Sequence, residues 1–239
     1  MNAQALVHKM QAAVYPFQNK AIRDVYQALG RGNNKILQLP TGAGKTYIAA
    51  AIIAHAVSKN RKVMFLVDRL SLLEQTATEF AKLGIYGSII QGDNTTYKWG
   101  DNVVIASIQT LENWGSWPDV NLIIVDECHD QRKALAEKME HWTGVKWIGL
   151  TATPYTTGLG NTWTEVVPGP SVADLIQQGY LSDFQAWGCP PDVSKVKTTA
   201  GDYNSKQLAE TVNNTELTGN ILKHWQEHAS QSEERRVVK

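Results

Sequence analysis

The stretch Leu37-Gln-Leu-Pro-Thr-Gly-Ala-Gly-Lys-Thr46 decides the fold that we expect for this chain of 239 residues. A short apolar run, Lys35–Leu39, leads into its glycines, and a helical pattern, Thr46–Ser58, follows them. Gly42 and Gly44 allow the backbone to curl so that its N–H groups point at phosphate oxygens, beside the positive end of the helix. The stretch therefore predicts a phosphate-binding loop between a strand and a helix.

The end of this loop carries the side chains that would act on a bound nucleotide. Lys45 would reach the β- and γ-phosphates of ATP, and the Thr46 hydroxyl would bind Mg²⁺. The general pattern of such loops has a glycine where Leu39 stands, so a chance glycine turn is the alternative. The surrounding strand and helix favour a nucleotide site, and its candidate contacts are Thr41, Gly42, Ala43, Gly44, Lys45 and Thr46.

A second motif, Leu122-Ile-Ile-Val-Asp-Glu-Cys-His129, is an apolar run that ends in two adjacent carboxylates. At the tip of a buried strand, Asp126 can hold Mg²⁺ through its water shell. Glu127 is placed to orient or deprotonate the attacking water, and we expect Glu127 and Lys45 to be the catalytic residues. Two acids in a solvated loop are the alternative, which the phosphate-binding loop upstream makes the weaker one.

Short apolar runs alternate with helical patterns, which is typical of a mainly parallel sheet with helices on both faces, and we predict the α/β class. Both motifs fall at the carboxyl ends of strands, where ligands collect in such sheets. The expected strands are Lys35–Leu39, Lys62–Val67, Gly87–Gln91, Asn102–Ala106, Leu122–Val125 and Lys146–Leu150. The expected helices are Gln18–Leu29, Thr46–Ser58, Ser71–Lys82, Lys133–Trp142 and Ser171–Gln178, with loops at Gly158–Gly160 and Pro168–Pro170.

The composition limits the classes of protein that need consideration. With 43% hydrophobic and 19% charged residues, the chain can form a globular core. Lys and Arg total 23, as do Asp and Glu, and this balance argues against a protein held to DNA mainly by a positive field. Two cysteines imply no disulfide framework. No apolar run suits a secretory signal or a membrane span, so we expect a cytoplasmic protein with no membrane partner.

Together the motifs resemble the superfamily 2 helicases of the DEAD/DEAH-like group, in a form with Asp-Glu-Cys-His at residues 126–129. Pro40-Thr-Gly-Ala-Gly-Lys-Thr46 is similar to the phosphate-binding loop of that group. The resemblance implies a RecA-like P-loop NTPase that couples ATP hydrolysis to movement on nucleic acid. Tyr15-Pro-Phe-Gln18 resembles the adenine-recognition element, which implies that Gln18 reads the base edge and that Tyr15, where relatives often have arginine, stacks on adenine.

Two further segments resemble elements that contact the bound strand in this group. Phe65-Leu-Val-Asp-Arg-Leu-Ser-Leu-Leu-Glu-Gln75 is similar to motif Ia, so Arg69 would contact phosphates. An ordinary amphipathic helix with a surface arginine is the alternative for that segment. Ala106-Ser-Ile-Gln-Thr-Leu111 loosely resembles motif Ib, and its candidate phosphate or sugar contacts are Ser107, Gln109 and Thr110.

Leu150-Thr-Ala-Thr-Pro154 resembles motif III, in which Thr151 and Thr153 would exchange hydrogen bonds with the Asp-Glu pair. We expect His129 to link the γ-phosphate site to this motif; a structural histidine is the alternative. Ser171–Leu181, which ends in Gly-Tyr-Leu, resembles the helix and turn that close the first motor domain of RadD-like, phage UvsW-like and type III restriction motor helicases. This last resemblance alone favours DNA over RNA as the partner.

The resemblance also implies a second RecA-like domain, which would complete the ATP site with an arginine. We expect the first domain to span residues 1–188, and residues 189–239 to be a linker and the start of the second domain. In that last part, Thr215–Ala229 has the pattern of an amphipathic helix and Arg235–Lys239 that of a strand. An arginine finger contributes about 10³–10⁵ in rate. We therefore expect this chain alone to bind ATP–Mg²⁺ and to hydrolyse it slowly.

Other functional classes stay open. One is a nucleic-acid-binding module that uses the nucleotide only as a switch, without unwinding; another is an RNA helicase. A different P-loop enzyme, such as a nucleotide kinase, is disfavoured by the order of the motifs. Of the eight tryptophans, Trp114 and Trp117 in a polar loop are the candidates for base stacking, whereas those beside strands are expected in the core.

Overall fold

The computed structural model describes residues 3–68, 70–92, 95–98, 100–130, 132–184, 196–199, 202–203 and 205–212. The chain divides into two compact units, Met1–Ser182 and Asp183–Lys239. The expected domain boundary at residues 188/189 stays a prediction. The predicted helix at Thr215–Ala229 and the predicted strand at Arg235–Lys239 lie outside the described residues. That the second unit begins another RecA-like domain stays a prediction.

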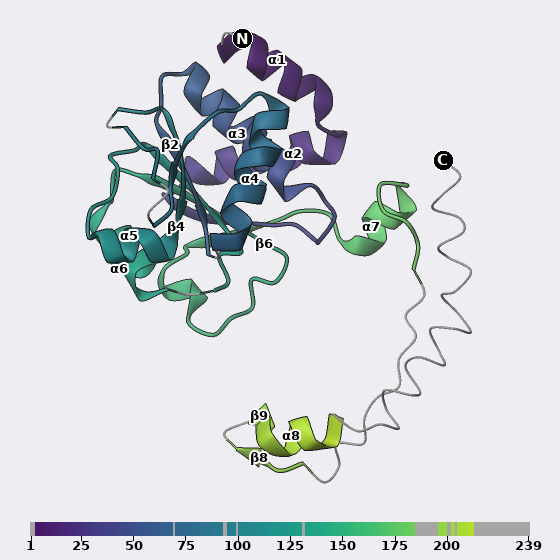
Figure 1. The fold of residues 1–239 in the computed structure, drawn as a ribbon. Coiled ribbons are helices and arrows are strands. Elements are labelled where there is room, and N and C mark those ends of the chain that lie inside the picture. Colours follow the sequence, from purple (N-terminus) through teal and green to yellow (C-terminus); the bar gives the residue numbers. More distant parts are fainter. Residues whose placement is uncertain are drawn as a thin grey trace. The chain divides into compact units, whose positions relative to one another are not determined.

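The first unit is built on a sheet in which every neighbouring pair of strands is parallel (Figure 1). The order across the described sheet is β3-β4-β2-β5-β6-β1-β7, and this seven-stranded arrangement confirms the predicted α/β class. The strands are β1 (Asn34–Gln38), β2 (Val63–Val67), β3 (Ser88–Ile90), β4 (Val103–Ser107), β5 (Leu122–Asp126), β6 (Lys146–Thr151) and β7 (Glu165–Pro168).

Helices cover both faces of this sheet, as predicted. Residues of α2, α3 and α4 pack in the core cluster on one face, and residues of α5 and α6 pack in the cluster on the other (Figure 1). The helices are α1 (Ala3–Ala13), α2 (Pro16–Leu29), α3 (Lys45–Ser58), α4 (Leu70–Leu83), α5 (Ile108–Trp114), α6 (Lys133–His141) and α7 (Val172–Gln177), with the 3₁₀ turn η1 (Leu159–Asn161). In the second unit, β8 (Thr198–Thr199) pairs antiparallel with β9 (Asp202–Tyr203), and α8 (Ser205–Val212) follows.

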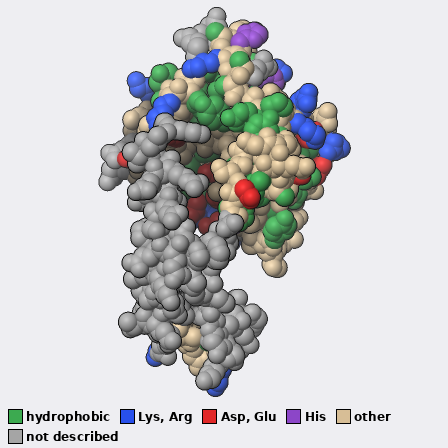
Figure 2. Space-filling view, turned by 90° about the vertical axis from the view of Figure 1, so that its right-hand side faces the viewer, with side chains coloured by type: hydrophobic (Ala, Val, Ile, Leu, Met, Phe, Trp, Pro, Cys, Tyr) green, Lys and Arg blue, Asp and Glu red, His purple; other side chains and the backbone are tan. Residues whose placement is uncertain are grey.

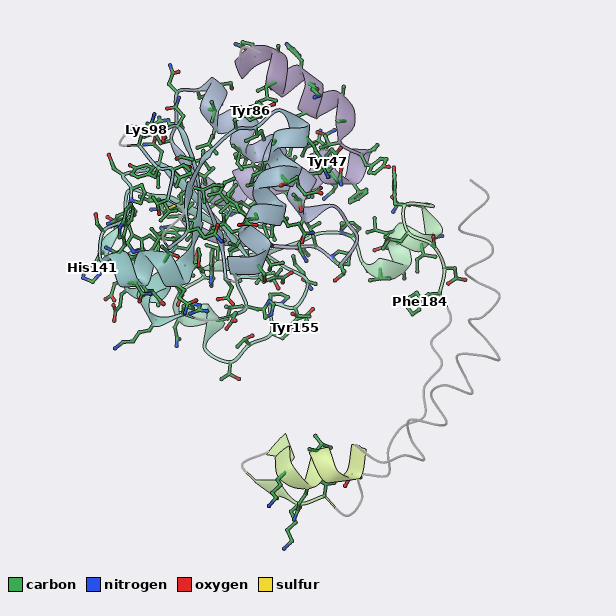
Figure 3. All side chains as sticks on the ribbon, viewed as in Figure 1. Tyr47, Tyr86, Lys98, His141, Tyr155 and Phe184 are labelled. Atoms are coloured by element: carbon green, nitrogen blue, oxygen red, sulfur yellow. The ribbon has the colours of Figure 1, made fainter. Side chains whose placement is uncertain are left out.

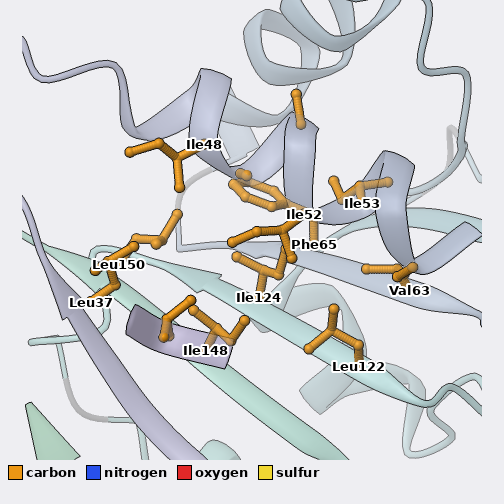
Figure 4. Close-up of a cluster of buried hydrophobic side chains, with 14 of the residues drawn as sticks. Leu37, Ile48, Ile52, Ile53, Val63, Phe65, Leu122, Ile124, Ile148 and Leu150 are labelled. Atoms are coloured by element: carbon orange, nitrogen blue, oxygen red, sulfur yellow. The ribbon is translucent and has the colours of Figure 1, made fainter. Parts of the chain in front are cut away.

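The core lies on both sides of the sheet because alternate residues of a strand point to opposite faces. Along β2, Val63 and Phe65 pack in the cluster that contains α3, whereas Met64 and Leu66 pack in the opposite cluster. Figure 4 shows the first cluster, in which isoleucines of α3 lie against the central strands. Strands that are buried on both faces are apolar throughout, which explains why short apolar runs predicted them.

Three elements of the first unit were not predicted: helix α1, the short helix α5 and the edge strand β7. Pro168, which was expected in a loop, is the last residue of β7. This strand pairs with β1, and among its four residues only Val167 is buried. Its sequence, Glu-Val-Val-Pro, offers only two valines before a proline, and so short an apolar run does not indicate a strand.

Charged side chains are dispersed over the one face of the first unit that Figure 2 shows. On the face shown in Figure 2, the Lys and Arg side chains of that unit are scattered among apolar and acidic ones rather than gathered in one patch. This distribution agrees with the equal totals of basic and acidic residues in the sequence. None of the described helices combines the length and the apolar character that crossing a membrane requires.

Gly149 on β6 leaves room for side chains of neighbouring segments. A Cβ at this position would lie 2.4 Å from Cys128 Sγ and 2.9 Å from the ring of Trp163, and both of these residues are buried. We expect Gly149→Ala to destabilise the fold by about 1–3 kcal/mol, because an extra methyl group in a filled core forces its neighbours to shift. The melting temperature should fall by about 2–12 °C.

Thermal unfolding followed by circular dichroism measures this effect. Gly144→Ala is the matched control, because a Cβ at Gly144 would meet no other atom within 4 Å. Equal melting temperatures for Gly149→Ala and the unsubstituted chain would contradict the packing argument.

Candidate nucleotide-binding site

The phosphate-binding loop lies between β1 and α3, where the sequence predicted it. Gly42 and Gly44 have φ angles of +83° and +78°, in the left-handed region that favours glycine. A Cβ on Gly44 would also lie 2.5 Å from Gln18 Nε2, so a side chain at this position would displace the Gln18 amide. Because α3 begins at Lys45, the free N–H groups of its first turn follow the loop directly.

Gln18 fastens the start of α2 to this loop. Its Oε1 accepts a hydrogen bond from the Tyr15 backbone N–H at 2.9 Å, and its Nε2 donates to the Ala43 carbonyl at 2.9 Å. The side chain is buried, and these two bonds fix which end of the amide faces the loop. Among the described residues, one N–H and one lone pair of the amide have no further partner. That Gln18 reads the edge of adenine stays a prediction.

A pocket of about 250 Å³ lies beside the loop, and its lining includes Gly42, Ala43, Gly44 and four aromatic side chains. Tyr180 lies at the centre of the aromatic group, with its ring 4.8 Å from that of Tyr15 and 4.9 Å from that of Phe17. The fourth aromatic is Tyr47 of α3, which Figure 3 shows on the side of the first unit that carries α7. Of the four, the sequence singled out only Tyr15 as a ring that stacks on adenine.

The Asp-Glu pair lies at the end of β5 and contacts the phosphate-binding loop. Lys45 Nζ is 3.1 Å from Glu127 Oε1, and the Lys45 side chain is only 15% exposed. Glu127 itself has a φ of +46°, a rare left-handed conformation for a residue with a side chain. This turn aims Glu127 back toward the loop, so the two motifs that the sequence predicted as one site do lie together.

The environment of Asp126 suits a neighbouring cation. Burial raises the pKa of the Asp126 carboxyl, and the negative charge of Glu127 raises it further, whereas Lys45 lowers it. A divalent cation beside the pair would offset both costs. Mg²⁺ at nucleotide sites usually binds one or two protein groups together with phosphates and waters, so Asp126 and Thr46 are sufficient donors. The described residues include no cluster of three or more His, Cys, Asp or Glu that could hold a metal on its own.

His129 connects Glu127 to the Thr-Ala-Thr segment. Its Nδ1 is 3.3 Å from Glu127 Oε2 and 2.8 Å from Thr151 Oγ1. The Thr151 hydroxyl, which is buried, in turn accepts a hydrogen bond from the Thr153 backbone N–H at 3.0 Å. The contacts therefore run without interruption from the P-loop lysine through Glu127 and His129 to motif III. That this path transmits the nucleotide state stays a prediction.

The residues predicted to contact nucleic acid have different surroundings. Arg69 lies outside the described residues. Gln109 is exposed on α5, and Thr110 accepts a hydrogen bond from the Gly92 N–H at 3.2 Å. Ser107 is fully buried, and its hydroxyl has no hydrogen-bond partner among the described residues. Its burial corrects the expectation for Ser107, because a buried side chain does not reach a strand at the surface.

The two tryptophans predicted to stack on bases differ in the same way. Trp117 is 7% exposed and packs edge-on against Trp142, with ring centroids 6.1 Å apart. The prediction that Trp117 stacks on bases is therefore wrong, because its ring is part of the core. Trp114 is 48% exposed at the end of α5 and stays a candidate.

Residues 11–156 of the chain match the protein family described as "Type III restriction enzyme, res subunit", and this range contains the phosphate-binding loop, the Asp-Glu pair and motif III. The type I restriction enzyme EcoAI endonuclease subunit of Escherichia coli is 28% identical over 227 residues, which cover 86% of this chain and 26% of that protein. The chain spans less than half the length of the curated relatives that it matches.

Solved structures share the fold of this chain. The UvsW helicase from bacteriophage T4 superposes with a TM-score of 0.53 at 21% identity, over 64% of this chain and 59% of that one. A nuclease-deletion mutant of the type ISP restriction-modification enzyme LlaGI, solved in complex with a DNA substrate mimic, has a TM-score of 0.55 at 19% identity, over 70% of this chain and 20% of that one. At these identities the likeness concerns the fold.

Proposed function

The chain belongs to the type III restriction enzyme res-subunit family and is the N-terminal RecA-like domain of a superfamily 2 helicase. We propose that it is the ATP-binding motor domain of a DNA helicase or translocase. The observation that carries the proposal is the 3.1 Å contact between Lys45 and Glu127, which joins the phosphate-binding loop to the Asp-Glu pair. A phosphate-binding loop that faces an acidic pair provides both groups that phosphoryl transfer to water can use, a cradle for the phosphates and a carboxylate for the water.

Each side chain of the site has a defined task in this proposal. The loop backbone and Lys45 bind the phosphates, and Thr46 and Asp126 hold Mg²⁺, which neutralises the charge on the phosphate oxygens when bound. Glu127 orients the attacking water and accepts its proton. When Lys45 turns to the phosphates, Glu127 loses its contact with the ammonium group and becomes available to that water.

In this proposal, the ATP site needs a residue that the first unit does not supply. A second RecA-like domain, which residues 189–239 would begin, contributes the arginine that stabilises charge in the transition state. Closure of the two domains on ATP and their release after hydrolysis would shift the grip along one strand, driven by the different affinities of the two states for nucleotide. The chain by itself is then a binder of ATP–Mg²⁺ with slow turnover.

Two observations on relatives favour DNA over RNA as the nucleic acid on which the motor moves. The Escherichia coli relative is a subunit of a restriction endonuclease, and LlaGI was solved with a DNA substrate mimic. An ATPase assay of the intact protein with single-stranded DNA, duplex DNA, branched DNA and RNA would show which nucleic acid stimulates hydrolysis. Stimulation by RNA alone would indicate an RNA helicase. Nucleic-acid binding that depends on nucleotide, without stimulated turnover, would indicate a switch module.

Nucleotide binding by the chain itself is the most direct test of the proposed function. Isothermal titration with ATP–Mg²⁺ should give one site, and the Gln18 edge should make ATP bind more tightly than GTP. A chain that is folded by circular dichroism and binds no nucleotide would overturn the proposal.

A separate prediction concerns the adenine base of ATP, which we expect to bind in the aromatic pocket. Tyr180→Ala should raise the Kd for ATP by about 2- to 12-fold, since an aromatic contact contributes about 0.5–1.5 kcal/mol beyond the area it buries. Tyr86→Ala is the matched control, because Tyr86 is exposed and does not line the pocket (Figure 3). An unchanged Kd for Tyr180→Ala, or an equal rise in the control, would count against adenine in this pocket.

A further inference from the structure

Arg132 lies at the centre of an ion-pair cluster outside the nucleotide site. Its Nε and Nη2 atoms both lie 2.5 Å from Asp68 Oδ1, and its Nη1 is 3.6 Å from Glu112 Oε2. The side chains of Arg132, Asp68 and Glu112 are 31%, 17% and 29% exposed. Partial shielding from water strengthens these pairs relative to ordinary surface ion pairs, and the two nitrogens on Asp68 fix the direction of the guanidinium.

The three partners come from three adjacent parts of the sheet. Asp68 directly follows β2, and Glu112 lies on α5, which directly follows β4. Arg132 lies between the Asp-Glu motif at the end of β5 and the start of α6. Since β4, β2 and β5 are neighbours in the strand order, one guanidinium joins the carboxyl ends of three consecutive strands.

Two of these connected segments are the ones expected to contact nucleic acid. Asp68 precedes Arg69 in the segment that resembles motif Ia, and Glu112 lies one turn after Gln109 on the helix of motif Ib. Arg132 itself stands three residues after His129, on the segment that continues the Asp-Glu pair. The cluster thus connects the ATP-binding edge of the domain to both of its expected strand-binding elements.

We propose that Arg132 is a positioning residue that holds the two strand-binding elements at the spacing that a single nucleic-acid strand requires. It acts through Asp68 and Glu112 and not on a phosphate, because its nitrogen donors face these carboxylates. The inference rests on the proposed function, since it assumes that the domain grips nucleic acid.

The experiment measures binding of a fluorescently labelled single-stranded DNA oligonucleotide to the chain by anisotropy, next to ATP–Mg²⁺ binding by titration. Arg132→Ala should raise the Kd for the oligonucleotide by about 10-fold, which corresponds to roughly one hydrogen bond to the strand that is lost when the strand-binding elements shift, and should leave the Kd for ATP within about 2-fold. Arg132→Lys keeps the charge but not the forked contact with Asp68, so its Kd should lie between those of Arg132→Ala and the unsubstituted chain.

Asp68→Asn tests the same contact from the other side. This variant should weaken oligonucleotide binding as Arg132→Ala does, and the double variant should be no worse than either single one, because both remove one shared interaction. Arg31→Ala is the matched control: Arg31 Nη2 lies 2.5 Å from Glu165 Oε1, at the other end of β1 from the phosphate-binding loop. The control should bind the oligonucleotide as the unsubstituted chain does.

The salt dependence separates positioning from direct contact. If Arg132 acts through the carboxylates of Asp68 and Glu112, the slope of the logarithm of the binding constant for the oligonucleotide against the logarithm of the salt concentration should be the same in Arg132→Ala as in the unsubstituted chain. A slope reduced by about 0.7 would show that Arg132 neutralises a phosphate of the strand, and would overturn the inference. Unchanged affinity in Arg132→Ala and Asp68→Asn, or a chain that binds ATP but no oligonucleotide, would overturn it as well. A folded chain that binds no ATP would instead refute the proposed function.

Discussion

Lys45→Ala is expected to raise the Kd of the chain for ATP–Mg²⁺ by about 10- to 150-fold. The ammonium group of Lys45 lies 3.1 Å from Glu127 Oε1, and its proposed partners are the phosphates of ATP. Losing a hydrogen bond from a charged donor costs about 1.5–3 kcal/mol, which gives this range. The variant also leaves Glu127 without its cation beside Asp126, so two adjacent negative charges would further oppose the phosphates.

Isothermal titration at one salt concentration measures the change. Lys133→Ala is a suitable control, because Lys133 also pairs with a glutamate, Glu137 at 3.7 Å, but does so on the exposed surface of α6. The control should bind ATP normally. A Lys45→Ala variant that binds ATP within a factor of about 2 of the unsubstituted chain would remove Lys45 from the nucleotide site.

Glu127→Gln is expected to preserve ATP binding and to slow its hydrolysis in the intact protein by about 10²–10⁴-fold, the usual contribution of a general base. Glutamine keeps the shape of the side chain but cannot accept the proton of the attacking water. Because the charge of Glu127 raises the pKa of Asp126, its removal should lower that pKa again. Asp126 should therefore remain ionised and able to hold Mg²⁺ in this variant.

Single-turnover hydrolysis of ATP, combined with titration of nucleotide binding, separates the two effects. Glu79→Gln serves as the control, since Glu79 pairs with Lys82 on the surface of α4 at 3.2 Å. Hydrolysis at the normal rate by Glu127→Gln would refute the role of Glu127. Loss of ATP binding together with hydrolysis would indicate that the carboxylate supports the loop rather than the chemistry.

The centre of the fold was predictable because its signals are local. The strands β1 and β5 are apolar runs that lead straight into the two motifs, and the structure places them within one residue of the expected bounds. The edge strand β7 was missed because its pairing with β1 depends on residues far away in the sequence. Trp117 was wrongly expected at the surface because its neighbours in the sequence are polar, whereas the ring that buries it, Trp142, comes from beyond α6.

In the candidate site, too, features with a local sequence signal were predictable and contacts between distant residues were not. The contact between Lys45 and Glu127 was foreseeable, since both residues belong to motifs with a known chemical logic. Tyr180 lies in the Gly-Tyr-Leu segment, but that resemblance did not indicate that its ring lines the pocket, and Arg132 lies in no motif that the sequence indicated. Arg132 meets Asp68 because β2 and β5 are adjacent in the sheet, and strand order is not written in any local pattern. Contacts of this kind become visible only when the chain is folded.

Gly149 also limits how the catalytic sequence itself can vary. Cys128, the third letter of Asp-Glu-Cys-His, is 1% exposed and occupies the space that a side chain at Gly149 would need. A larger side chain at position 128 therefore cannot extend toward β6, and the space open to it is a pocket of about 230 Å³ that Cys128 lines together with Leu135, Thr162 and Trp163. Packing against Gly149 thus limits the size of the residue that separates Glu127 from His129.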